Sequence, residues 1–115
     1  MKQKPTIDPI TRHSVEMFLA RIAPDYPVVE AWLYGSRARG DAGADSDADV
    51  AVILNGPKRR AIDVAKGMAG AEFDIMLETG MMVSALPIAA EDWNEPYRHS
   101  NPYLIANIKR EGIRL

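Results

Sequence analysis

The sequence predicts an α/β (α+β) fold in which helices flank a small mixed sheet. Helical and strand-like stretches alternate along the chain with short connections between them. The chain has 115 residues, of which 47% are hydrophobic and 26% are charged. These values are typical of one globular domain and not of a disordered segment. We therefore expect a single domain over residues 1–115.

The first half of the chain contains one clear helix and one clear strand. Asp8 can cap a helix over residues 9–22, and Pro9 suits its first position. The apolar side chains of this stretch recur at the spacing of one helix face: Val15, Phe18, Leu19 and Ile22. Residues 28–34 then predict a strand with apolar side chains on both faces, as expected for a strand that is covered on both sides.

A glycine-serine turn joins this strand to the next one. Gly35 and Ser36 lead into a short helix that Gly40 ends. The loop over residues 41–46 is followed by a second strand over residues 47–54, which is rich in Val and Ile.

The second half predicts two more helices and a third strand. A helical stripe begins after Pro57 and ends near Gly67 and Gly70, with Ala61, Ile62, Ala65 and Met68 on its apolar face. Residues 72–77 alternate like a strand, whereas residues 81–93 are less clear and suggest a strand around Val83 and Ser84 before a loop. The last helix begins with Asn101 as its cap and ends at Gly112.

The spacing of small and acidic residues around the second strand points to phosphate chemistry. Gly35 and Ser36 follow a strand, where free backbone N–H groups can bind a phosphate. Asp47 and Asp49 are one residue apart, so a strand places both carboxylates on one face, ~6.5 Å apart along the backbone. Such a pair can hold a divalent metal against the phosphate. The alternative, a solvated acidic turn, stays open for this pair taken alone.

Asp74 is the natural third carboxylate for a site with two metal ions. It lies in phase within the predicted strand over residues 72–77, between apolar Phe73 and Ile75, where an unpaired acid is costly. Arg37 and Arg39 lie one turn from the expected phosphate. We expect one of them to neutralise phosphate charge and the other to pair with a nearby acid.

Composition excludes several classes of protein. The net charge of −2 argues against a general nucleic-acid binder, and the absence of cysteine excludes disulfides and thiolate zinc sites. The start, residues 1–13, has lysines but no apolar run behind them, so no secretory signal is predicted. No apolar stretch approaches the ~20 residues needed to cross a membrane. We expect a cytoplasmic protein.

The pattern of motifs in this chain resembles that of the minimal nucleotidyltransferases of the DNA polymerase beta superfamily. The pattern consists of the run GSRARG, the run SDADVAVIL after it, and Asp74. Among these nucleotidyltransferases, the chain is similar to the MNT antitoxins of HEPN/MNT toxin–antitoxin modules. The resemblance covers most of the chain, from the helix before the first strand to the closing helix, and implies the nucleotidyltransferase fold.

This resemblance also implies a site and an activity. Asp47, Asp49 and Asp74 would bind two Mg²⁺ ions, while Gly35 and Ser36 would bind the triphosphate of ATP, with Arg39 beside them. Such antitoxins transfer AMP from ATP to a tyrosine of their HEPN ribonuclease toxin and silence it. At this length the chain has no room for an acceptor-binding domain, so we expect the acceptor on a docked partner.

Two other functions stay open at this point. A binding module could neutralise the toxin by covering it without catalysis. A transferase could instead modify a small hydroxyl compound, as antibiotic-modifying relatives do, and would then need no protein partner.

Overall fold

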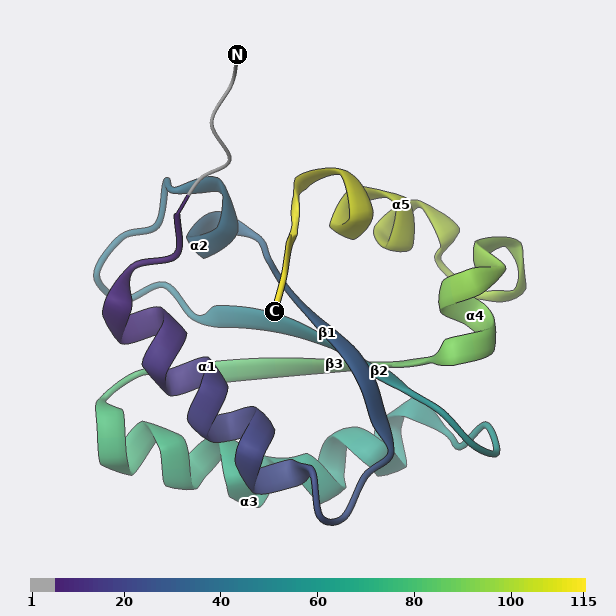
Figure 1. The fold of residues 1–115 in the computed structure, drawn as a ribbon, viewed down its shortest axis with the longest axis horizontal. Helices are drawn as coiled ribbons and strands as arrows, with labels where there is room; N and C mark the ends of the chain where they lie inside the picture. The colour runs from purple at the N-terminus through teal and green to yellow at the C-terminus, as the bar shows by residue number, and fades with distance from the viewer. Residues whose placement is uncertain (1–5) are drawn as a thin grey trace.

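The computed structural model describes residues 6–115. They fold around a four-stranded sheet with the order β3-β2-β1-β4 (Figure 1). Strand β1 (Val28–Tyr34) pairs antiparallel with β2 (Ala48–Leu54) and with β4 (Ile113–Arg114), while β2 pairs in parallel with β3 (Val83–Ala89). The mixed sheet and its flanking helices confirm the predicted fold class.

Helices cover both faces of the sheet. Helices α1 (Pro9–Ile22) and α3 (Ala61–Thr79) pack on one face, and α4 (Ala90–Asn94) and α5 (Pro102–Glu111) pack on the other (Figure 1). Two short elements complete the chain: the one-turn helix α2 (Ser36–Arg39) after β1, and the 3-10 turn η1 (Pro96–Arg98) before α5.

The sheet divides the core into two clusters because successive strand residues point to opposite faces. On β2, Val50 and Val52 face α1 and α3, whereas Ala51 and Ile53 face α4 and α5. The first cluster also contains Val15, Phe18, Leu33, Met68, Ile75 and Val83, and the second contains Ile88, Trp93, Ile105 and Ile108.

The caps predicted at the starts of the first and last helices are confirmed. The Asp8 side chain accepts a hydrogen bond from the Thr11 backbone N–H at 2.9 Å at the start of α1. The Asn101 side chain accepts one from the Leu104 N–H at 3.2 Å at the start of α5. Each cap satisfies a backbone donor that the helix itself leaves free.

The prediction of a strand over residues 72–77 is wrong. Helix α3 runs through Gly67 and Gly70 without a break and ends only at Gly80, whose φ is 78°. Its buried side chains, Val64, Met68 and Ile75, recur at helical spacing. The strand-like alternation misleads because Phe73 and Leu77, which it would bury together with Ile75, are 54% and 67% exposed.

The third strand lies later in the chain. Strand β3 begins at Val83, where the sequence suggested a strand around Val83 and Ser84, and it continues to Ala89. The two-residue strand β4 was not predicted, because pairing so short depends on the partner strand β1. Within residues 6–115, no helix combines the length and apolar character needed to cross a membrane. The prediction about a leader in residues 1–13 falls partly on residues 1–5, outside the described range.

Candidate functional site

Strand β1 ends in a turn that requires glycine. Gly35 has φ 74° and ψ −157°, a backbone conformation that residues with a side chain rarely adopt. A β-carbon at this position would lie 2.5 Å from Oδ2 of Asp49. The absence of a side chain therefore lets the Asp49 carboxylate lie directly against the turn.

Pairing between β1 and β2 fixes the carboxylate pair beside this turn. Tyr34, which precedes Gly35, is the partner of Asp49 across the two strands. Asp47 lies one residue before the first residue of β2, so the strand begins one residue later than predicted. Burial raises the pKa of Asp49, the neighbouring Asp47 carboxylate raises it further, and Arg39 opposes both. The structure thus brings Gly35, Asp47 and Asp49 together.

Tyr34 belongs to the same site, although the sequence analysis did not single it out. Burial and the charge of Asp49 raise the pKa of its phenol to about 12. The phenol therefore stays neutral at physiological pH beside the carboxylate. Its position directly before the glycine-serine turn is the signal that could have identified it.

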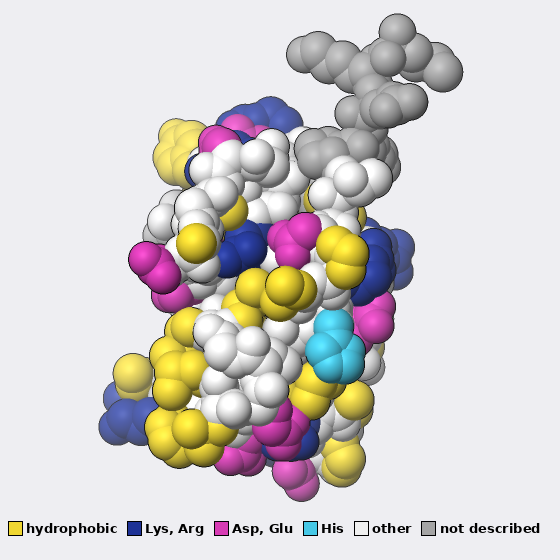
Figure 2. Space-filling model, turned by 90° about the vertical axis from the view of Figure 1, so that its left-hand side faces the viewer, with side chains coloured by type: hydrophobic (Ala, Val, Ile, Leu, Met, Phe, Trp, Pro, Cys, Tyr) yellow, Lys and Arg dark blue, Asp and Glu magenta, His cyan; other side chains and the backbone are white. Residues whose placement is uncertain are grey.

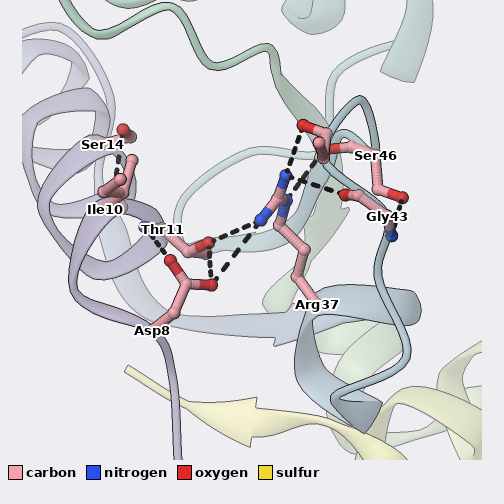
Figure 3. A network of polar contacts seen from close by, with 8 residues as sticks. Asp8, Ile10, Thr11, Ser14, Arg37, Gly43 and Ser46 are labelled. Carbon is pink, nitrogen blue, oxygen red and sulfur yellow. Dashed lines mark hydrogen bonds and ion pairs between the residues drawn. The ribbon is translucent and has the colours of Figure 1, made fainter.

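Arg37 holds the loop that leads to the carboxylates (Figure 3). Its side chain is only 10% exposed. Its Nε donates to the Ser46 carbonyl at 2.8 Å, and its Nη1 donates to Oγ1 of Thr11 at 3.2 Å and lies 3.6 Å from Oδ2 of Asp8. Arg37 thereby ties α2 and the loop before Asp47 to the start of α1.

Arg39 has a different environment. Its Nε donates to Oδ2 of Asp41 at 3.2 Å, and its Nη1 lies 3.8 Å from Oε2 of Glu111. Its side chain is about half exposed, and its charge also acts on Asp49. Arg39 therefore pairs with acids, as expected for one of the two arginines, and its contact with a substrate stays a prediction.

The structure does not bring Asp74 to the carboxylate pair. Asp74 lies on helix α3 and pairs with Arg21 of α1, with Oδ2 3.4 Å from Nη1. Nowhere in residues 6–115 do three or more His, Cys, Asp or Glu side chains gather so that they could hold a metal ion. The prediction of a third carboxylate from a strand over residues 72–77 is wrong, since that segment is helical and its acid faces α1.

A serine occupies the neighbouring position on the actual third strand. The parallel register of β2 and β3 makes Ser84 the partner of Asp49. This neighbour is not predicted from the sequence, because the third strand is expected over residues 72–77. The weak strand signal around Val83 and Ser84 was the clue that could have placed it.

A small hollow opens beside Asp47. Its volume is about 160 Å³, and its walls combine the polar loop before β2 with the end of α3 and the start of the next segment. The residues that line it are Arg37, Ala44, Asp45, Ser46, Asp47, Met76, Gly80, Met81 and Met82. One carboxylate of the pair is therefore accessible from this hollow.

The sheet therefore places a glycine turn against a carboxylate pair, an arrangement that can hold a phosphate and a divalent cation together. Residues 15–115 match the model of the Nucleotidyltransferase domain family, and the chain belongs to this family. A solved structure of a candidate nucleotidyltransferase from Sulfolobus solfataricus is similar over 93% of this chain and 86% of its own, with 15% identity and a TM-score of 0.44. The comparison with curated proteins finds no match.

The residues of the site fit the metal that this family generally uses with a nucleoside triphosphate. Carboxylate oxygens are the ligands that Mg²⁺ prefers, and Mg²⁺ usually takes only one or two from the protein before substrate and water complete its shell. Asp47 and Asp49 supply two, and the close contact of Asp49 with Gly35 places them beside the turn. The donor set suits a metal that shares its coordination with a triphosphate.

Proposed function

We propose that the protein transfers AMP from ATP to a hydroxyl group of a partner protein. The observation that carries the proposal is the packing of Asp49 against Gly35, which joins the glycine-serine turn and the carboxylate pair into one site. Membership of the Nucleotidyltransferase domain family supports the class of reaction.

Each residue of the site has a role in this reaction. Asp47 and Asp49 would hold the divalent cation, which supplies positive charge to the triphosphate. The turn at Gly35 and Ser36 would bind phosphate oxygens through backbone N–H groups, because the first N–H groups of a helix have no partner within it. Arg37 would keep the loop before Asp47 in place.

The chemistry is a displacement at the α-phosphorus of ATP. The acceptor oxygen forms a bond to this phosphorus, the bond to the bridging oxygen of the β-phosphate breaks, and pyrophosphate leaves. The acceptor also loses its hydroxyl proton. We do not assign this step to Asp74, because it lies on α3 and pairs with Arg21 of α1. We infer that solvent or a group of the partner receives it.

Exposed apolar side chains near the hollow that contains Asp47 support a protein as the acceptor. Met82 lines this hollow and is 38% exposed, and Phe73 and Leu77 are exposed on α3, whose last turn borders the hollow. Figure 2 shows hydrophobic side chains gathered on this side of the molecule, where α3 ends. A docked partner would cover these side chains and bring its hydroxyl to the carboxylate pair.

The resemblance to MNT antitoxins makes the partner more specific. We propose a HEPN-type ribonuclease toxin as the acceptor, modified on a tyrosine and thereby inactivated. ATP and the ribonuclease's RNA substrates meet in the cytoplasm, so the proposal includes this location.

A second candidate function is a binding module that covers its partner without modifying it. The specific observation in its favour is Ser84, which stands beside Asp49 on β3 where an in-phase carboxylate would complete the site. Under this alternative, neutralisation of the partner depends on the exposed apolar side chains and not on the carboxylates of Asp47 and Asp49.

Transfer of labelled AMP separates the two functions. The protein is incubated with ATP labelled on the α-phosphate, Mg²⁺ and a purified HEPN-type ribonuclease as the acceptor. We expect label on the partner, its loss in the Asp47→Asn, Asp49→Asn double variant, and retention in the Asp25→Asn control, which changes an exposed acid in the turn after α1. Equal labelling by the double variant refutes the site, and toxin neutralisation without labelling favours the binding module.

A further inference from the structure

A second cavity lies at the other end of the sheet from Gly35. It has a volume of about 490 Å³, and the last residues of β2 and β3, Leu54 and Ala89, form part of its wall. Asp49 and Leu54 are separated by ~16 Å of strand at about 3.3 Å per residue. The cavity is therefore separate from the proposed nucleotide site, and its volume is that of a small-molecule pocket.

Part of the lining of this cavity is apolar. Val64 and Ile88 are buried residues of the lining, and Tyr26 also lines it. The Tyr26 hydroxyl lies against the backbone of Gly67 on α3, where a side chain would collide with it. Proline rings complete the walls: Pro27, Pro57 and Pro87. Such a lining favours an aromatic or other flat apolar group.

Hydrogen-bond donors dominate the polar part of the lining. The cationic side chains are Lys58, Arg59, Arg60 and Arg98. His99 adds a donor, because its Nδ1 accepts a hydrogen bond from the Asn101 N–H at 3.0 Å and leaves Nε2 to carry the proton of the neutral ring. A ligand must therefore bring acceptors.

The one acid in the lining is already compensated. Asp92 is 2% exposed, and Nζ of Lys58 lies 3.2 Å from its Oδ1 and 3.0 Å from its Oδ2. The acids that pair with the arginines, among them Glu95 with Arg98 at 3.1 Å, do not line the cavity. Ion pairs at the surface are weak because water screens them, so an incoming oxyanion can compete for these guanidinium groups.

We propose that this cavity binds a small molecule that has a flat apolar body and a phosphate or carboxylate group. The body lies against Tyr26 and Ile88, and the oxyanion accepts hydrogen bonds from Arg59 and Arg98 at the rim. The proposal concerns the other end of the sheet and does not depend on nucleotide transfer.

Chemical-shift mapping with 1-naphthyl phosphate tests this proposal. Titration into ¹⁵N-labelled protein should shift the resonances of residues 54–60, 87–89 and 98–100. 1-Naphthol, which has the same rings without the charge, should bind at least about tenfold more weakly, the change expected when a charged hydrogen bond is lost. 1-Naphthoate distinguishes a carboxylate ligand from a phosphate ligand, and binding of either supports the site.

Matched variants test whether Arg59 and Arg98 at the rim of the cavity bind the oxyanion. The Arg59→Gln, Arg98→Gln double variant should bind 1-naphthyl phosphate at least about tenfold more weakly than the wild type. Arg12→Gln, the same change on the exposed face of α1, should leave its affinity unchanged. The proposal is overturned if the shifts lie only around Gly35 and Asp49, if 1-naphthol binds as well as the phosphate, or if the Arg59, Arg98 variant binds as tightly as the wild type.

Discussion

The two ends of strand β2 carry opposite chemistry although they share the same neighbouring strands. At its start, Asp49 lies against the Gly35 turn beside Asp47, so two acids meet there with backbone donors. At its end, Leu54 borders a cavity lined by cations and by the one buried acid, Asp92. The first end needs a cation before it can hold a phosphate, whereas the second can bind an anion directly.

This difference shows why the net charge says little about ligands here. The chain carries a charge of −2, which argues against a general nucleic-acid binder. Two acids nevertheless lie together at the start of β2, whereas cations surround the cavity at its end. Variants that change one end and leave the other intact can therefore test whether the two ends act independently.

Gly35→Ala should have the largest effect. The new β-carbon displaces the Asp49 carboxylate and forces a side chain into a left-handed backbone, so we expect the free energy of unfolding to fall by about 3 kcal/mol. Gly40→Ala is the matched control, because Gly40 also has a positive φ but no atom lies within 4 Å of its added β-carbon. Its loss should be about 1 kcal/mol. Urea unfolding of both variants measures the difference, and equal losses would show that Asp49 does not pack tightly there.

Lys58→Met should have the next largest effect, at the other end of the sheet. It leaves the buried Asp92 carboxylate without its cation, and because Lys58 itself is half exposed we expect a loss of about 2 kcal/mol. Lys66→Met, the same change on the exposed side of α3, should change the unfolding free energy by less than about 0.5 kcal/mol. If thermal unfolding shows the same loss of stability in both variants, the Lys58–Asp92 pair does not stabilise this end of the sheet.

Asp8→Ala should have the smallest effect and a pH signature. The side-chain hydrogen bond from Thr11 lowers the pKa of Asp8 below 3.8. Its stabilisation is thus present above pH 3.8 and is lost as the pH falls through the lowered pKa. At pH 7 we expect a loss of about 1 kcal/mol, the usual value for a helix cap. In acid titrations followed by circular dichroism, the difference from wild type should shrink below pH 3.8, and a constant difference would contradict this role.

Local signals in the sequence predicted the elements that depend on local contacts. Asp8 and Pro9 mark the start of α1, and Asn101 marks the start of α5, because caps involve residues three positions apart. The Gly35 turn and the neighbouring Asp49 were also correctly joined, since β1 and β2 are close in sequence and pair directly.

The parts that sequence reasoning missed depend on tertiary packing. Residues 72–77 have both a strand-like and a helix-like pattern, and burial of Ile75 against the core beneath the sheet decides for the helix. That error moved Asp74 to a strand it does not occupy and hid Ser84, the true neighbour of Asp49. The role of Arg37 was missed for a similar reason, because Thr11, one of its partners, is 26 residues away.

Calorimetric titration of MgATP measures nucleotide binding at the Asp49 end without needing a partner. We expect the wild type and Asp74→Asn to bind MgATP equally. The Asp47→Asn, Asp49→Asn variant should bind MgATP at least about a hundredfold more weakly, equivalent to about 2.7 kcal/mol. Undiminished binding by that double variant, or an equal loss in Asp74→Asn, would contradict this expectation.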